Sequence, residues 1–165
     1  MVFDVSDEAF RNVTASYAGM LAGKEHRTLP RYIDAGGSLY AEHLQDGWHG
    51  PENGFRWMAK QAKVELAAPA GPNSLLRVSG SCPRQQLSRG PLTLTVSVEG
   101  RAYPPSVISD ADKAFSFTYR LGPEFQDRTS LQVGLEVDRT ISAQGDKRAL
   151  GLTFGRFEIV REVQR

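Results

Sequence analysis

Residues 92–98 are Leu92-Thr93-Leu94-Thr95-Val96-Ser97-Val98, and every second residue in this stretch is apolar. Because side chains of a β-strand point alternately to opposite faces, this pattern predicts a strand with one buried and one solvated face. The same alternation recurs over residues 115–119, 131–137 and 150–161. In the last of these runs the phase shifts at Gly155-Arg156, which indicates a bulge or bend.

Weaker patterns predict further strands over residues 38–44, 57–66 and 75–79. In the run 57–66 the expected inward residues are Met58, Ala62, Val64 and Leu66, and Trp57 is expected to enter the core at the start of the strand. Turns rich in glycine and proline separate the runs. Many strands at such spacing, with no helix between them, are typical of an antiparallel two-sheet β-sandwich, whereas a parallel sheet needs helical crossovers.

The N-terminal part of the chain follows a helical period instead. Its apolar residues lie on one helical face, and they are Phe10, Val13, Tyr17, Met20 and Leu21. The pattern predicts a helix over residues 7–22, and Gly23 suits its C-terminal end. We therefore expect an all-β fold with one N-terminal α-helix, in which a helical segment (1–29) packs on a β-sandwich domain (30–165).

The composition is that of one globular domain. The chain has 165 residues, of which 40% are hydrophobic and 24% charged. A formal net charge of +1 argues against nucleic acid as a partner, since no strong basic field is present. No apolar run approaches the roughly 20 residues that span a membrane, and no secretory signal is seen, so we expect no membrane association and a cytoplasmic location. The single cysteine, Cys82, excludes an internal disulfide and a multi-cysteine zinc site.

Both tryptophans lie in one segment, Asp46-Gly47-Trp48-His49-Gly50-Pro51-Glu52-Asn53-Gly54-Phe55-Arg56-Trp57. An aromatic ring beside polar side chains suits sugar binding, because the ring stacks on the C–H face of a pyranose while polar groups bind its hydroxyls. A second polar cluster follows at Asp146-Lys147-Arg148, where a guanidinium can bind a carboxylate or a sugar. The candidate ligand-binding residues are Trp48, His49, Glu52, Arg56 and Arg148.

A structural interpretation of the same residues stays open. In it, the tryptophans are internal packing, and Glu52 forms an ion pair with Arg56 or with Arg148 that holds two loops together. No metal and no cofactor is predicted under either interpretation.

Several blocks of the sequence resemble the accessory, carbohydrate-binding-like β-sandwich domains of bacterial glycosyltransferases and other sugar-processing proteins. These blocks are Gly47-Trp48, Glu52, Arg56-Trp57, residues 75–80, residues 92–100 and residues 146–152. The resemblance extends over about residues 36–160. It implies a jelly-roll or galactose-binding-like sandwich, a bacterial source, a non-catalytic role and a carbohydrate ligand.

Two other functions remain open. The chain can be a structural or protein-interaction module that docks a protein partner, or a second copy of itself, through the helix or a sheet face. It can also be a metal-dependent jelly-roll enzyme that uses His43, His49 and Glu52 as ligands. The five residues between the two histidines do not match the tighter His-x-His pair of cupin-type enzymes. Because the sequence also lacks a nucleophile elbow and a phosphate-binding loop, we expect a binding module and no enzyme.

Overall fold

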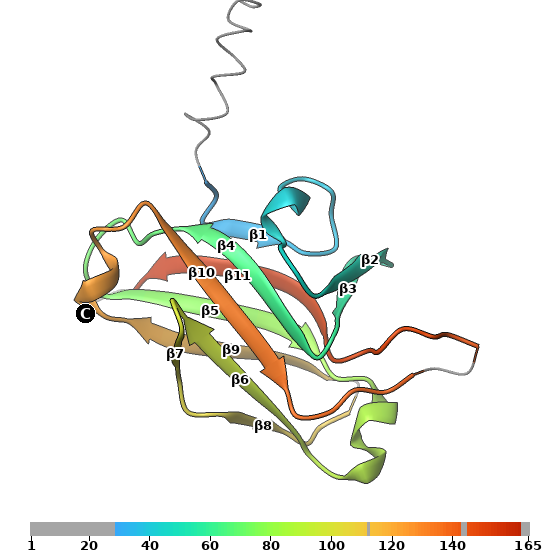
Figure 1. The fold of residues 1–165 in the computed structure, drawn as a ribbon. Helices are drawn as coiled ribbons and strands as arrows, with labels where there is room; N and C mark the ends of the chain where they lie inside the picture. The colour runs from blue at the N-terminus through green and yellow to red at the C-terminus, as the bar shows by residue number, and fades with distance from the viewer. Residues whose placement is uncertain (1–28, 112, 143–144, 163–165) are drawn as a thin grey trace, which may run out of the picture.

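The computed structural model describes residues 29–111, 113–142 and 145–162, which form two antiparallel β-sheets packed as a sandwich (Figure 1). This arrangement confirms the predicted antiparallel two-sheet β-sandwich. The helix predicted over residues 7–22 lies outside the described residues, as does nearly all of the segment 1–29. In the part of the chain that the structure describes, no helix has the length and apolar character needed to cross a bilayer. The cytoplasmic location stays a prediction.

One sheet follows the path β2 (Trp48–Glu52), β3 (Phe55–Met58), β11 (Thr153–Arg161), β5 (Ser74–Ser81) and β9 (Ala114–Leu121). The short strand β1 (Tyr32–Asp34) also pairs with β11, so this sheet has six strands. Strand β3 pairs with Thr153 and Phe154 of β11, whereas β1 pairs with Arg156 to Glu158. The register of β11 against β5 shifts between Phe154 and Arg156, which confirms the predicted bulge. Strand β11 therefore pairs first with β3 and then with β1, and Gly155 lies where the pairing partner changes.

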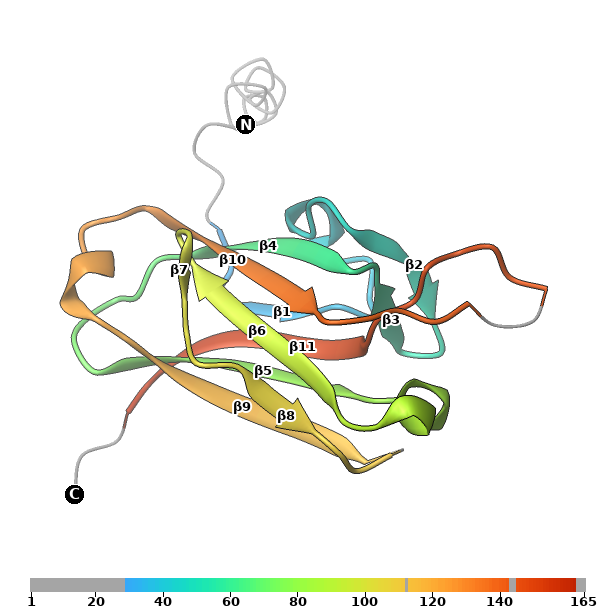
Figure 2. The same cartoon turned by 60° about the horizontal axis from the view of Figure 1, so that its bottom comes forward.

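The other sheet follows the path β4 (Gln61–Ala67), β10 (Ser130–Val137), β6 (Leu92–Val98) and β7 (Arg101–Ala102), and β8 (Ser106–Ile108) also pairs with β6. Figure 2 shows the two sheets as two layers, with β4, β10 and β6 in one layer and β11, β5 and β9 in the other. Short 3₁₀ helices lie in the connections: η2 (Ala41–His43), η3 (Arg84–Arg89) and η4 (Pro123–Phe125).

The core lies between the sheets and is built from alternate residues of the long strands. The fully buried side chains include Leu76, Val78, Leu92, Leu94, Val96, Val98, Leu131, Val133, Phe154 and Phe157. Burial of each large apolar side chain contributes about 1.5–3 kcal/mol. The alternating residues 92–98 thus take the inward and outward positions that their period predicts.

Three local predictions are wrong. The strand predicted over residues 57–66 is divided into β3, which ends at Met58, and β4, which begins at Gln61 in the other sheet. Residues 38–44 form no strand, because Tyr40 has a left-handed backbone (φ 66°) and the 3₁₀ helix η2 follows it. Trp57 does not enter the core: Arg56 and Met58 are the buried residues of β3, and Trp57 is half-buried on the outer face. The inward position predicted for Met58 is correct, and the strand period then requires its neighbour Trp57 to face outward.

Candidate functional site

Trp48 contributes to the packing of the core. Its ring makes edge contacts with Phe154 and Phe157, at centroid separations of 5.9 and 5.8 Å. Its indole Nε1 donates a hydrogen bond of 2.9 Å to the carbonyl oxygen of Lys63. A half-buried tryptophan usually satisfies its N–H in this way. Both the ring and its polar atom are therefore engaged within the protein.

Arg56 is buried, and its guanidinium binds backbone carbonyls of the surrounding loops. It donates to the carbonyl oxygens of Ala35 at 2.8 Å, His49 at 3.1 Å and Gly37 at 3.3 Å. Burial lowers the pKa of Arg56 from its ordinary value. Its hydrogen bonds connect the segment after β1 to β2 and β3, so Arg56 has a structural role in this region.

Arg148 joins its own loop to strand β2. It donates to the Glu52 carboxylate at 2.7 Å and to the Asp146 carboxylate, with a shortest distance of 2.7 Å. These contacts confirm the Arg148–Glu52 pair of the structural interpretation. The hydrogen bonds from Arg148 lower the pKa of Asp146 to about 2, and the same bonds raise the pKa of Arg148. His49 Nε2 lies 2.9 Å from the carbonyl oxygen of Ala149, a further hydrogen bond between the same two segments.

The structure thus brings Trp48, His49, Glu52, Arg56 and Arg148 into one region, where their polar atoms bind other parts of the protein. These contacts favour the structural interpretation, in which the five residues hold neighbouring segments together. Their role in ligand binding stays a prediction. The metal site proposed as an alternative is not assembled. His43 lies near Glu42 and Glu65, and no cluster of at least three His, Cys, Asp or Glu side chains suited to a metal occurs among the described residues.

The hydrogen bonds between Arg148 and Asp146 predict that the stability of the fold depends on pH. The folded-state pKa of Asp146, about 2, lies below the unfolded value of about 3.9. The stabilisation from Asp146 is therefore complete above the unfolded pKa and is lost as the pH falls through the folded pKa. In Arg148→Met, NMR titration of the Asp146 carboxyl is expected to return its pKa toward the ordinary value. An ordinary pKa for Asp146 in the unmodified protein would contradict the described geometry.

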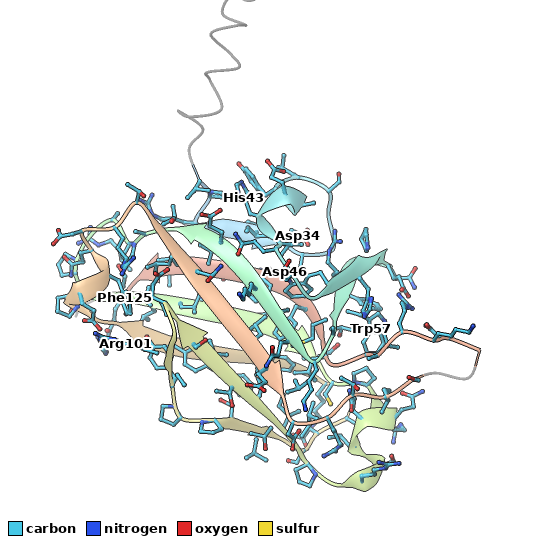
Figure 3. The ribbon with its side chains drawn as sticks, viewed as in Figure 1. Asp34, His43, Asp46, Trp57, Arg101 and Phe125 are labelled. Carbon is cyan, nitrogen blue, oxygen red and sulfur yellow. The ribbon has the colours of Figure 1, made fainter. Side chains whose placement is uncertain are left out.

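An open hollow lies on the outer face of the six-stranded sheet, and we call it the bulge pocket. Its volume is about 560 Å³, within the range of about 300–1,000 Å³ typical of ligand sites. It is centred on the β11 bulge, and its residues come from β1, β3, β11, β5 and β9. Figure 3 labels two residues of this sheet, Asp34 of β1, which lines the pocket, and Trp57 of β3.

Small residues form the floor of the bulge pocket. At Gly155 a Cβ atom would meet nothing within 4 Å, so the missing side chain leaves open space. Beyond it, Ser81 bonds to Thr153 at 2.8 Å, and Ser79 bonds to Ser116 at 3.3 Å. These paired hydroxyls make the floor polar, and their short side chains leave the pocket open.

Aromatic and charged side chains form the wall of the bulge pocket. Phe55 stands on the β3 side, held in place by a two-residue turn in which Asn53 and Gly54 both have positive φ (50° and 84°). Tyr32 and Arg156 stand on the β1 side, with the guanidinium 5.6 Å from the ring centroid. An aromatic wall beside charged groups and a polar floor can bind a ligand with both an apolar and a hydroxylated face.

Sequence reasoning missed this pocket, although one signal was present. Asn53-Gly54 is the strongest short hairpin signal, and it fixes the register of the strands on either side of it. With Met58 inward, that register places Phe55 and Trp57 together on the outer face, where their rings pack at 6.3 Å. The serines of β5 and β9 gave no comparable signal.

Comparison with known proteins shows a shared fold. No protein-family model matches the chain, and no curated protein matches it in sequence. Among solved structures, a family GH115 4-O-methyl-α-glucuronidase with specificity for decorated arabinogalactans is similar at a TM-score of 0.51 and 13% identity. The alignment covers 83% of this chain and 18% of the glucuronidase, so this chain corresponds to a small part of that protein.

Two further structures are similar at lower TM-scores. A ruminal GH26 endo-β-1,4-mannanase has a TM-score of 0.47 at 15% identity, with 82% of this chain and 26% of the mannanase covered. A family 35 carbohydrate-binding module from Clostridium thermocellum has a TM-score of 0.41 at 9% identity, with 81% and 91% covered. At these identities the likeness concerns the fold alone, and the fold that this chain shares with part of the glucuronidase is the β-sandwich.

Proposed function

We propose that this protein is a non-catalytic binding module that holds a saccharide in the bulge pocket. The observation that carries the proposal is an open pocket of about 560 Å³ with an aromatic wall and a hydroxyl-lined floor. The shared fold with a segment of a carbohydrate-active enzyme makes saccharides the ligand class to test first.

The chemistry of the pocket matches a pyranose ring. Phe55 offers a ring for the C–H face of the sugar, while Asp34 and Arg156 offer an acceptor and donors for its hydroxyls. Glycoside hydrolysis ordinarily uses a pair of carboxylates. Of the described residues that line the pocket, Asp34 is the only carboxylate, which favours binding over hydrolysis.

A side chain at position 155 tests the site directly. Gly155 has open space above it and no positive φ, so Gly155→Leu is expected to fill the pocket without straining the strand. The saccharide that binds the unmodified protein best on a glycan array is expected to bind this variant at least about tenfold more weakly by calorimetry, a loss of about 1.4 kcal/mol.

Gly50→Leu is the matched control. Gly50 is exposed on β2, has equally open space at its Cβ position and does not line the pocket, so the same substitution there is expected to leave binding unchanged. The proposal fails if no saccharide on the array binds, or if Gly155→Leu binds as tightly as Gly50→Leu.

A further inference from the structure

A second hollow lies on the outer face of the five-stranded sheet, the opposite surface of the sandwich. Its volume is about 470 Å³. Its centre is Gly134 of β10, which stands in register with Lys63 of β4 on one side and Ser97 of β6 on the other. We call this hollow the glycine trench.

The floor of the trench lies where β10 has a glycine and the Ser97 hydroxyl covers it, since a Cβ atom at Gly134 would stand 2.6 Å from Ser97 Oγ. Strand β10 turns Gln132, Gly134 and Glu136 outward. Gln132 Nε2 donates to Gln45 Oε1 at 2.8 Å, and Glu136 Oε2 accepts from Gln61 Nε2 at 3.2 Å. Each of these bonds crosses from β10 toward the β4 edge, on either side of Gly134. A glycine inside a strand weakens the strand and often marks a place where a ligand approaches the backbone closely.

Four of the polar side chains that line the trench have no partner within the described residues, whereas the other two, Gln61 and Glu136, bond to each other. The Lys63 ammonium, the Asp46 carboxylate and the hydroxyls of Thr95 and Ser97 line the hollow. In the described ranges, none of these side-chain groups takes part in a hydrogen bond or ion pair, whereas the serines of the bulge pocket bond to Thr153 or to each other. Figure 3 labels Asp46, which comes from the segment hydrogen-bonded to β4 through Lys63.

We propose that the glycine trench binds the hydroxyl edge of a saccharide. A sugar hydroxyl is both donor and acceptor, so neighbouring hydroxyls can donate to Asp46 and accept from Lys63. Two carboxylates against one ammonium disfavour an anion, and the ammonium disfavours a metal cation. The lining has no aromatic ring, so the contact is made through hydrogen bonds. This proposal does not depend on the bulge pocket. Together, the two sites allow one molecule to bridge two saccharide chains.

NMR titration of the ¹⁵N-labelled full chain tests the trench. The probes are xylotriose, mannotriose, cellotriose and galactotriose, each up to about 10 mM, where a ligand with a Kd near 1 mM is about nine-tenths bound. At least one probe is expected to shift the backbone amides of Ser97, Gly100 and Gly134. In Gly155→Leu these shifts are expected to persist, which separates the trench from the bulge pocket.

The double variant Lys63→Met/Asp46→Asn removes the two charges of the trench that have no partner among the described residues and keeps Glu136. Both positions are exposed, so the fold is expected to stay intact. Its trench shifts are expected to need at least about tenfold more ligand. Lys60→Met, at another exposed lysine outside the trench, is expected to bind as the unmodified protein does. The proposal is overturned if no probe shifts the trench amides, or if the double variant shows the same binding as Lys60→Met.

Discussion

Replacing Arg56 by methionine is expected to lower the free energy of unfolding by about 3–4 kcal/mol. The guanidinium donates to three carbonyl oxygens, those of Ala35, Gly37 and His49. Hydrogen bonds from charged donors contribute about 1.5–3 kcal/mol each, and a buried acceptor left without a partner costs about 1–3 kcal/mol. These contributions do not add fully, because the loops can relax and admit water. Urea denaturation, followed by tryptophan fluorescence, measures the change.

Arg101→Met is the matched control for this substitution. Arg101 is 71% exposed and pairs with Glu124 at 3.0 Å. Exposed ion pairs contribute about 0–1 kcal/mol, so the control is expected to lose less than about 1 kcal/mol. A loss of similar size in both variants would contradict the structural role of Arg56.

Replacing Trp48 by alanine is expected to lower the free energy of unfolding by about 3 kcal/mol. The substitution removes the contacts with Phe154 and Phe157 and leaves the Lys63 carbonyl without its indole donor. Truncation of large aromatic side chains in cores costs about 3–5 kcal/mol, and the partial exposure of Trp48 places it at the low end. Thermal or urea denaturation of the variant measures the loss.

Trp57→Ala provides the comparison within the same segment. Trp57 is half-buried on the outer face and packs on Phe55, so its removal is expected to cost only about 1 kcal/mol. The sequence alone assigned the two tryptophans the opposite way, with Trp57 in the core and Trp48 nearer a ligand. If Trp57→Ala loses more free energy of unfolding than Trp48→Ala, the assignment made from the sequence is supported instead.

The fold was predictable wherever the information is local. Residues 92–98 have a strict period of two, and they form β6 with every predicted residue buried. The phase shift at Gly155-Arg156 corresponds to the bulge in β11. The pairing of Arg148 with Glu52 was one of two interpretations that the charges allowed, and the structure selects it.

The candidate site was less predictable, because it depends on which strands become neighbours. Ser81 and Thr153 are 72 positions apart, and only the order β11–β5–β9 brings them to one pocket floor. Arg56 has a side chain that usually stays at the surface, but here the nearby loop carbonyls give it partners and so permit its burial. The sequence pattern contained neither the strand order nor the loop path.

We have proposed that the outer-face bulge pocket binds the ligand, whereas the contacts of Trp48 hold the fold together. The most direct test measures, by calorimetry, the affinity of Gly155→Leu and Trp48→Phe for the saccharide that binds the unmodified protein best. We expect Gly155→Leu to bind at least about tenfold more weakly at unchanged stability. We expect Trp48→Phe, which keeps an aromatic ring but loses the bond to Lys63, to bind normally at reduced stability. Normal binding by Gly155→Leu, with binding lost in Trp48→Phe, would contradict the claim.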